Sequence, residues 1–312
     1  MRLCRFQTDE RIRIGFYDEH RVLPLEAVAA LVQKSTRFPV SESIVDYLPG
    51  GAFHREVRKL ERQLDEADPA AVEVVTVPVD AARLLVPVAH PSKLLLLAGN
   101  YSKHIEEGGG KAEERSKTFP YVFMKPPLTT LTHPGDPVKI PAVSPDEIDW
   151  ELELGVIIGR ECRNVSEADA LSYVAGYTVV NDISDRAFKP NPGRAERPKD
   201  GFFDWLHGKW HDTFCPIGPC VLPADRCDDP QQLALTLKLN GEIEQNASTA
   251  DMVFPVAAVV EFVSSFVTLQ PGDVISTGTP DGVGKAKGKF LKPGDVLEAE
   301  IEGIGLLRNP VE

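Results

Sequence analysis

The chain has 312 residues, 42% of them hydrophobic and 26% charged, which is typical of a soluble globular protein with one large domain or a main domain and a smaller one. Its formal net charge of -13 argues against nucleic acid or an anionic membrane as a partner. No stretch approaches the ~18 consecutive apolar residues of a membrane span, and the start lacks the apolar run of a signal peptide. Five cysteines without a C-x-x-C pair indicate reduced thiols and a cytoplasmic protein.

Residues 1–90 are predicted to form a small N-terminal unit. Apolar alternation, helical periodicity and β-branched runs predict a hairpin, two helices and a strand, at residues 12–22, 26–33, 55–66 and 74–79. No motif in this unit suggests chemistry, so we interpret it as structural. The catalytic domain is expected at residues 91–312.

A first candidate pair follows an apolar run at residues 93–99, which is typical of a buried strand. His104 and Glu107 are three residues apart, and on a helix this spacing makes them neighbours. Glu107 could then orient His104 or raise its basicity; the alternative is an exposed helical ion pair. Three glycines and a charged run at residues 108–117 form either a mobile lid over a pocket or a plain surface loop.

Residues 149–154 alternate apolar and acidic side chains. This period of two predicts a strand whose apolar side chains pack inward and whose acids, Asp149, Glu151 and Glu153, share the other face. Same-face Cα atoms lie about 6.6 Å apart, so two carboxylates could converge on one cation, and their hard oxygens suit Mg, Mn or Ca. The alternative is a half-buried strand with a solvated acidic face.

Further polar residues stand at the end of a predicted strand over 177–180. Asp182 follows that strand, where the backbone would hold it rigidly, and Arg186 comes in the next turn. Residues 189–199 are rich in Pro and charge and should form a loop. The aromatic cluster over residues 202–206 is interpreted as core or interface.

The C-terminal third contains a predicted hairpin over 232–245, because alternating leucines lead into Asn240-Gly241, the sequence of a type I′ turn. An apolar helix is predicted over 254–269, where little polar surface predicts that it is covered. A strand at 274–277 leads into the loop 278–285. That loop fails the Walker A spacing, although a backbone nest for a substrate carboxylate or oxyanion stays open.

Several of these pieces together resemble the fumarylacetoacetate hydrolase superfamily across about residues 93 to 309. The resemblance implies an α+β, β-rich fold, with a mixed β-roll or barrel-like catalytic domain, a small N-terminal α/β domain and usually a dimer. The motifs that carry it are Gly99-Asn100-Tyr101 with His104, Glu151-Leu152-Glu153-Leu154, Val180-Asn181-Asp182, Gly208-Lys209 with Asp212-Thr213-Phe214, and the run from Thr277 to Gly284.

The resemblance also implies roles for single residues. The expected metal ligands, for Mg or Mn, are Glu151, Glu153 and Asp182. The expected catalytic residues are the dyad His104 and Glu107, which would activate water or move a proton, and the active-site lysine, Lys209. The expected substrate contacts are Thr279 with the Gly278 backbone and, less specifically, Arg186 and Lys125.

One departure concerns the branch that cleaves fumarylacetoacetate itself, which carries an extra acidic metal ligand near Asn100. No acid stands there in this chain, which weakens the case for that substrate.

We therefore expect a metal-dependent hydrolase that cleaves a carbon–carbon bond in acylpyruvate-like 2-oxo acids, in the catabolism of aromatic compounds or sugar acids. An isomerase or decarboxylase of hydroxymuconate-type or oxaloacetate-type acids could use the same site. A non-catalytic carboxylate-binding protein is the third hypothesis. The expected partners are a small 2-oxo acid and a second copy of the chain.

Overall fold

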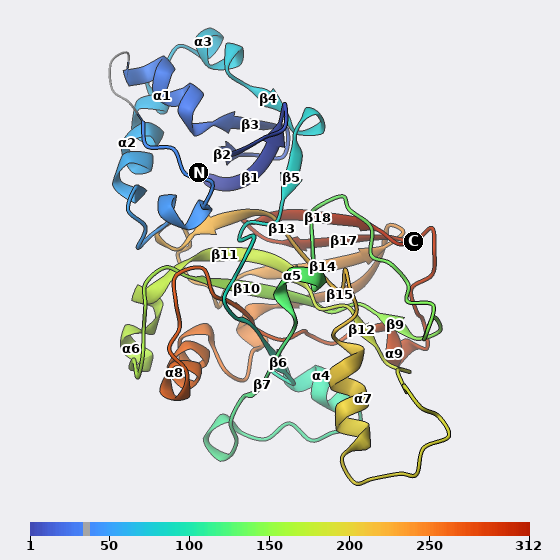
Figure 1. Cartoon of the computed structure of the whole chain (residues 1–312). Coiled ribbons are helices and arrows are strands. Elements are labelled where there is room, and N and C mark those ends of the chain that lie inside the picture. Colours follow the sequence, from blue (N-terminus) through green and yellow to red (C-terminus); the bar gives the residue numbers. More distant parts are fainter. Residues whose placement is uncertain (34–37) are drawn as a thin grey trace.

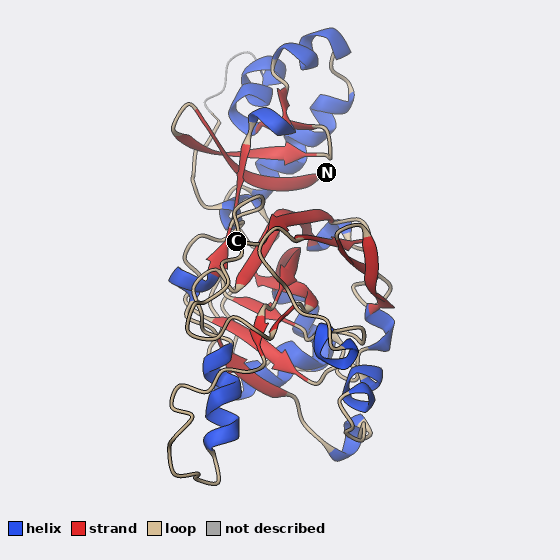
Figure 2. Ribbon diagram, turned by 90° about the vertical axis from the view of Figure 1, so that its right-hand side faces the viewer, coloured by secondary structure: helices blue, strands red, loops and turns tan. Residues whose placement is uncertain are grey.

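The computed structural model describes residues 1–33 and 38–312. Figures 1 and 2 show the N-terminal elements gathered at one end of a larger, strand-rich body, with the chain's C-terminus near the junction of the two parts. The mixed, β-rich fold expected from the sequence is confirmed.

The N-terminal part packs helices against short antiparallel strands (Figure 1). The predicted hairpin and both predicted helices are present, whereas the strand expected at 74–79 is mostly wrong. Asp68 caps a helix that begins at Pro69, and this start signal outweighs the β-branched residues that follow. The elements are β1 (Arg2–Thr8), β2 (Arg11–Tyr17), β3 (Arg21–Pro24), α1 (Leu25–Gln33), η1 (Ile44–Tyr47), α2 (His54–Asp65), α3 (Pro69–Val74), β4 (Val77–Pro78), η2 (Val79–Ala81) and β5 (Arg83–Leu85).

The main sheet runs in the order β4-β3-β2-β1-β13-β11-β10-β16-β6-β7, with β5 paired to β1 and β8 paired to β13. Its remaining strands are β6 (Leu94–Ala98), β7 (Tyr121–Met124), β8 (Leu131–Thr132), β10 (Leu152–Ile158), β11 (Val174–Asn181), β13 (Cys215–Pro223) and β16 (Val274–Ser276). Its pairings are antiparallel except β16 with β6 and β13 with β8. In the described chain this sheet has two ends, at β4 and β7, so it is open and is not a closed barrel.

The two parts share backbone pairing and apolar packing. Strand β1 pairs with β13, with Leu3 opposite Val221. One apolar cluster contains Phe16 and Leu60 from the N-terminal part as well as Ile157 from β10. The division near residue 90 therefore stays a prediction.

A second sheet runs in the order β15-β14-β17-β18, and β9 and β12 form a short ribbon. The predicted hairpin is confirmed, since Asn240 (φ 53°) and Gly241 (φ 84°) adopt the left-handed turn that joins its strands. The strands are β9 (Ile148–Asp149), β12 (Ser184–Asp185), β14 (Ala234–Leu239), β15 (Glu242–Ser248), β17 (Val296–Ile301) and β18 (Gly305–Pro310).

The helices of the larger part are short and lie around the sheets (Figures 1 and 2). In the described residues they are α4 (Ser102–Glu107), η3 (Arg115–Lys117), α5 (Pro127–Thr130), α6 (Glu167–Ala170), η4 (Leu171–Tyr173), α7 (Asp200–Gly208), η5 (Ala224–Arg226), η6 (Thr249–Asp251), α8 (Val256–Phe266) and α9 (Gly284–Lys287). None of the helices described is long and apolar enough to cross a bilayer. A cytoplasmic location stays a prediction.

Aromatic side chains lie exposed where β7, α7 and α8 meet. Phe202 is 56% and Phe203 44% exposed, so the expectation that they belong to the core is wrong. Phe266 is 55% exposed, so the predicted cover of α8 stops short of its last turn. A groove of about 290 Å³ runs here, and seven of its nine lining residues are aromatic. The expectation of an interface at this face stays a prediction.

Candidate active site

The main sheet brings the predicted metal ligands together. Glu151 lies between β9 and β10, Glu153 lies on β10, and Asp182 follows the last residue of β11. Leu152 stands opposite Asn181 across these antiparallel strands, and the Asp182 N–H donates to the Glu151 carbonyl oxygen at 2.8 Å. One carboxylate oxygen from each of the three acids lies within 4.8 Å of the other two.

These acids are buried, so the alternative of a solvated acidic face is wrong. Asp149, Glu153 and Asp182 are 0% exposed, and Glu151 is 5% exposed. Strand β10 is buried along its whole length, because apolar clusters cover both of its faces, with Leu154 and Val156 in one cluster and Ile157 in the other. The alternation of apolar and acidic residues therefore places a polar layer inside the protein.

Cationic side chains contact two of the three acids. Lys209 Nζ donates to Glu151 Oε2 and to Asp182 Oδ2, at 2.6 Å each. Lys125 forms an ion pair with Asp182 Oδ1, and Arg186 donates through Nη2 to Glu151 Oε1. Lys125 and Arg186, expected at the substrate, here contact the expected metal ligands, and their substrate roles stay predictions.

These contacts stabilise the ionised forms. Burial alone would raise the pKa of Glu151, but Lys209, Arg186 and His104 together hold that pKa well below its ordinary value. Burial opposes the charge on Lys209 as well, yet Asp182 and Glu151 raise the pKa of this ammonium above its usual range. Glu151 and Lys209 therefore stay charged at neutral pH.

Glu153 has neutral hydrogen-bond partners. Its Oε2 accepts the Ser276 hydroxyl at 2.5 Å and the Gly278 N–H at 3.0 Å. Its Oε1 is buried and has no hydrogen-bond partner among the residues that the structure describes. Burial, Asp182 and Glu151 raise the pKa of Glu153 well above its ordinary value. A proton or a cation is needed to offset this repulsion.

The donor set fits a divalent cation that prefers oxygen ligands. Glu151, Glu153 and Asp182 offer only carboxylate oxygens, the ligands that suit Mg²⁺, Mn²⁺ and Ca²⁺. Among the described residues, none hydrogen-bonds to Glu153 Oε1, so this oxygen is available to bind a cation. The geometry therefore supports a divalent metal, and the choice between Mg²⁺ and Mn²⁺ stays a prediction.

Helix α4 places His104 and Glu107 side by side, as the spacing predicts. His104 Nδ1 lies 3.6 Å from Glu107 Oε2, just outside hydrogen-bond distance, and both side chains are 22% exposed. No described residue hydrogen-bonds to this Nδ1. The loop 278–285 connects this helix to the acids, because the Gly282 N–H binds Glu107 and the Gly278 N–H binds Glu153. The catalytic role of the dyad stays a prediction.

The loop 278–285 directs backbone N–H groups at the protein's own carboxylates. The pairs are Gly278 to Glu153 at 3.0 Å, Gly282 to both oxygens of Glu107 at 3.1 Å, Gly284 to Asp149 at 2.6 Å and Lys285 to Asp149 at 3.1 Å. The expected backbone nest thus holds side chains of the protein here, and the contact of Gly278 with substrate stays a prediction.

Thr279 belongs to a hydrogen-bonded group that the sequence did not reveal. Its hydroxyl donates to the Leu152 carbonyl oxygen at 3.0 Å and accepts from Gln245 Nε2 at 2.8 Å. Gln245 Oε1 accepts the Leu152 N–H at 2.9 Å. A glutamine on a hairpin strand carries no spacing signal, so only the fold shows that Gln245 holds β10 in place.

Asn100, near which the resemblance implies an extra acid in one branch, is buried and binds backbone groups. It donates to the carbonyl oxygens of Phe254 (3.0 Å) and Thr277 (2.8 Å) and accepts the Phe254 N–H at 2.8 Å. These bonds hold the segment before α4 against the loop that follows β16 and against the residues that precede α8.

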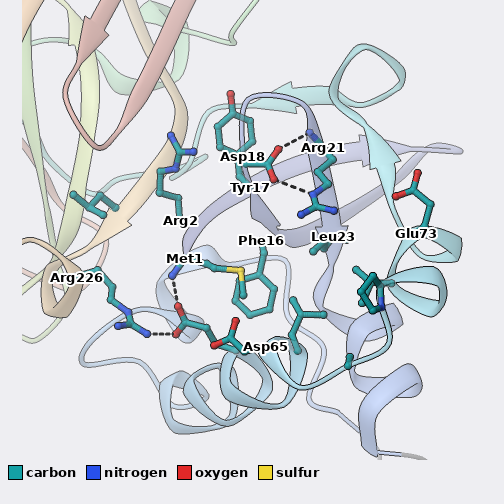
Figure 3. A pocket seen from close by; sticks show the side chains of 16 residues that line it. Met1, Arg2, Phe16, Tyr17, Asp18, Arg21, Leu23, Asp65, Glu73 and Arg226 are labelled. Carbon is teal, nitrogen blue, oxygen red and sulfur yellow. Dashed lines mark hydrogen bonds and ion pairs between the residues drawn. The ribbon is translucent and has the colours of Figure 1, made fainter.

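A cavity of about 910 Å³ lies away from these acids, in the N-terminal part (Figure 3). Its wall includes Tyr17, Arg21 and Asp65, with Arg226 contributed by η5. The predicted site residues, all within the described chain, are absent from its lining.

Comparison with known proteins identifies the site's family. Residues 93–312 match the family model described as fumarylacetoacetate (FAA) hydrolase C-terminal. The chain is 43% identical over 229 residues to a 2,4-didehydro-3-deoxy-L-rhamnonate hydrolase of Sphingomonas sp. strain SKA58, which covers 72% of this chain and 75% of the relative. It is 40% identical over 230 residues to the oxaloacetate tautomerase fahd2 of Xenopus laevis, which covers 73% of this chain and 68% of the relative.

Solved structures resemble the whole chain. The maleylpyruvate hydrolase of Sphingobium sp. SYK-6, solved in complex with manganese (II) ion and pyruvate, matches with a TM-score of 0.72 at 29% identity, over 100% of this chain and 98% of that one. Relatives of this kind are hydrolases, isomerases and tautomerases, so the chain is an enzyme and the non-catalytic hypothesis is set aside. The family match over residues 93–312, which contain every predicted site residue, shows that the chain belongs to the fumarylacetoacetate hydrolase family.

Proposed function

We propose that this enzyme is a divalent-metal-dependent hydrolase that cleaves a carbon–carbon bond in acylpyruvate-like 2-oxo acids. The observation that supports this most directly is the buried group of Glu151, Glu153 and Asp182, with Lys209 bridging two of its members. When bound there, a divalent cation supplies Lewis acidity to the carboxylate and 2-oxo oxygens of such an acid.

Charge balance favours a substrate with one carboxylate. The site groups four buried acids with three cations, namely Asp149, Glu151, Glu153 and Asp182 with Lys125, Arg186 and Lys209. If all are ionised, one negative charge remains, and a divalent cation changes the sum to one positive charge. A single carboxylate then neutralises the site, whereas a second one, as in oxaloacetate, needs a cation from outside this group.

We assign Lys209 the role of stabilising the enolate that forms as the bond breaks. Its ammonium is fixed by two carboxylates, so it needs little reorganisation during the reaction. The rings of Phe123 and Trp205 lie over Nζ, with centroids at 5.4 and 6.0 Å. These faces shield the cation from water and strengthen its interaction with a developing oxyanion.

His104 is the group we assign to proton transfer. With Nδ1 facing Glu107, its Nε2 takes a proton from water while the water oxygen adds to the distal carbonyl carbon. The bond from that carbon to C3 then breaks, and the enolate of pyruvate takes up a proton at C3. The products are pyruvate and the free acid of the acyl group.

A keto–enol tautomerase is the second candidate. The same residues can remove and return the proton at C3 without attack by water. The observation that favours this function is the 40% identity to a relative named oxaloacetate tautomerase. The two candidates differ in whether the carbon–carbon bond is broken.

A proton NMR time course with a simple acylpyruvate, with Mn²⁺ kept substoichiometric or replaced by Mg²⁺ to limit line broadening, separates the candidates. We expect pyruvate and the free acid to form only with metal, and EDTA to stop the reaction. An intact acylpyruvate whose keto and enol forms exchange faster would overturn hydrolysis and support the tautomerase. Glu153→Gln, loaded in the same way, is the control for catalysis by free metal.

A further inference from the structure

We propose that Asp149 and Arg186 are positioning residues that connect the Glu151 carboxylate to the helix carrying His104 and Glu107. The connection runs through the turn 282–285. The inference rests on the proposed function, because it takes Glu151 as a metal ligand and His104 with Glu107 as the proton-transfer pair.

Asp149 has both carboxylate oxygens fully engaged. Oδ1 accepts the N–H groups of Trp150 at 2.8 Å and Gly284 at 2.6 Å. Oδ2 accepts Arg186 Nε at 2.9 Å and the Lys285 N–H at 3.1 Å. The side chain is 0% exposed. With four donors on two oxygens, Asp149 is saturated as an acceptor, which distinguishes it from Glu153 and rules it out as a further metal ligand in this arrangement.

Arg186 joins Asp149 to the metal ligand Glu151. Its guanidinium donates through Nε to Asp149 and through Nη2 to Glu151 Oε1, and the side chain is only 10% exposed. Glu151 Oε2 is taken by Lys209. Two different cations therefore hold the two oxygens of Glu151, and this fixes the plane of its carboxylate.

Two adjacent residues of the stretch 149–154, Asp149 and Trp150, form hydrogen bonds with the turn 282–285. Asp149 accepts the N–H of Gly284, and Trp150 Nε1 donates to the Gly282 carbonyl oxygen at 3.2 Å. Position 284 has no room for a side chain, because a Cβ there would lie 2.0 Å from the Lys289 carbonyl oxygen. Motion of this stretch therefore moves the turn with it.

The same turn binds helix α4 on its other side. The Gly282 N–H lies 3.1 Å from both carboxylate oxygens of Glu107. Gly282 has φ +96°, and a Cβ there would meet the Glu244 carbonyl oxygen at 2.2 Å, so the conformation that aims this N–H at Glu107 requires glycine. A continuous set of contacts thus joins Glu151 to Glu107, and a loss of Asp149 or Arg186 should disturb both.

The test uses Mn²⁺ titration calorimetry and amide hydrogen exchange on the full chain. We expect Asp149→Asn to lower Mn²⁺ affinity about ten- to a hundredfold, as for other residues that orient a metal ligand. We also expect faster exchange in the Mn²⁺-free protein over residues 102–107, since the helix loses its fixed neighbour. Arg186→Lys should cause the same two changes more weakly than Arg186→Met, because lysine keeps the positive charge but lacks the planar guanidinium that binds Asp149 and Glu151 through two nitrogens.

Asp273→Asn is the matched control. Asp273 is also 0% exposed, pairs with Lys93 at 2.8 Å and accepts backbone N–H groups, but it does so at the far end of β16. This variant should lose stability while Mn²⁺ affinity and exchange over 102–107 stay at the wild-type level. Equal changes in the control would show general destabilisation and overturn the inference.

Wild-type Mn²⁺ affinity or wild-type exchange over 102–107 in folded Asp149→Asn would also overturn it. If that variant does not fold, the two Arg186 variants decide by the same readouts. Neither readout needs turnover. Coupled changes in a protein that turns over no 2-oxo acid would refute the proposed function and leave the inference standing, while turnover without coupled changes would do the reverse.

Discussion

Buried acids at two places in this chain have opposite surroundings. On α2, Glu61 is 6% exposed and contacts three cationic groups. It pairs with the Met1 amine, with Arg58, and with Arg226 at 2.6 Å; Figure 3 shows the pairs from Met1 and Arg226. Burial alone would raise the pKa of Glu61, but the amine, Arg226 and Arg58 lower it.

At the candidate active site the acids are gathered against one another. Glu153 faces Asp182 and Glu151, its pKa is raised, and one of its oxygens has no hydrogen-bond partner in the described chain. The difference teaches that burial of an acid is not itself a sign of function. A group in which acids outnumber the cations in contact with them stores repulsion that a metal ion can relieve, whereas Glu61 has no such deficit.

The largest expected effect comes from a substitution among the acids of the candidate active site. Glu153→Gln removes a ligand charge, so we expect Mn²⁺ binding and turnover to be lost together, beyond the ten- to hundredfold of an outer-shell change. Glu61→Gln should keep both. Calorimetry with Mn²⁺ and the NMR assay measure this, and full activity in Glu153→Gln would refute the metal assignment.

His104→Ala separates proton transfer from metal binding. We expect hydrolysis to fall by about 10²- to 10⁴-fold, the usual contribution of a general base, while Mn²⁺ affinity stays within about twofold. Steady-state kinetics and calorimetry on the same preparation give both values. Hydrolysis that survives the substitution would show that the dyad assignment is wrong.

The unfolding free energy, measured against pH, should distinguish Glu61 from Glu153. Glu61 has a pKa lowered from 4.5, so its contribution is present above pH 4.5 and is lost as the pH falls through its folded pKa. Glu153, with EDTA present, has a raised pKa, so the folded state loses stability as the pH rises above 4.5. We expect urea unfolding from pH 3 to 8 to show both pH dependences of the unfolding free energy. The loss at low pH should vanish in Glu61→Gln, and the loss above pH 4.5 should vanish in Glu153→Gln. At neutral pH, Glu61→Gln should cost about 2 kcal/mol.

The smallest effect is expected at the exposed aromatic face. Phe202 is 56% exposed, so Phe202→Ser should change the unfolding free energy of a single chain by less than about 0.5 kcal/mol. Thermal unfolding and sedimentation velocity, measured together, also test whether the expected homodimer uses this face. A dimer that dissociates on this substitution would place the interface here, and a large loss of monomer stability would contradict the exposed position.

Local signals in the sequence predicted much of the fold. The hairpin around Asn240-Gly241 and helix α2 follow from turn chemistry and periodicity, and both are confirmed. The strand expected at 74–79 is mostly wrong, because the helix capped at Asp68 runs to Val74 and the strand that follows covers only Val77–Pro78. The period of two around Glu153 gave the alternation of side chains, but it could not show that both faces of β10 are covered, since that depends on strands distant in the chain.

The candidate site, too, was predicted from the sequence only in part. By itself the sequence determined which residue types are present, and its resemblance to the fumarylacetoacetate hydrolase superfamily predicted that His104, Glu151, Glu153, Asp182 and Lys209 belong to one site. Only the tertiary structure decided that Arg186 binds Asp149 and Glu151, that Gln245 supports β10, and that the glycines of the loop 278–285 donate to the protein's own acids. Hydrogen bonds need atoms placed within about 3 Å. These bonds join residues at least 35 positions apart in the chain, which reach that distance only when the sheet has formed.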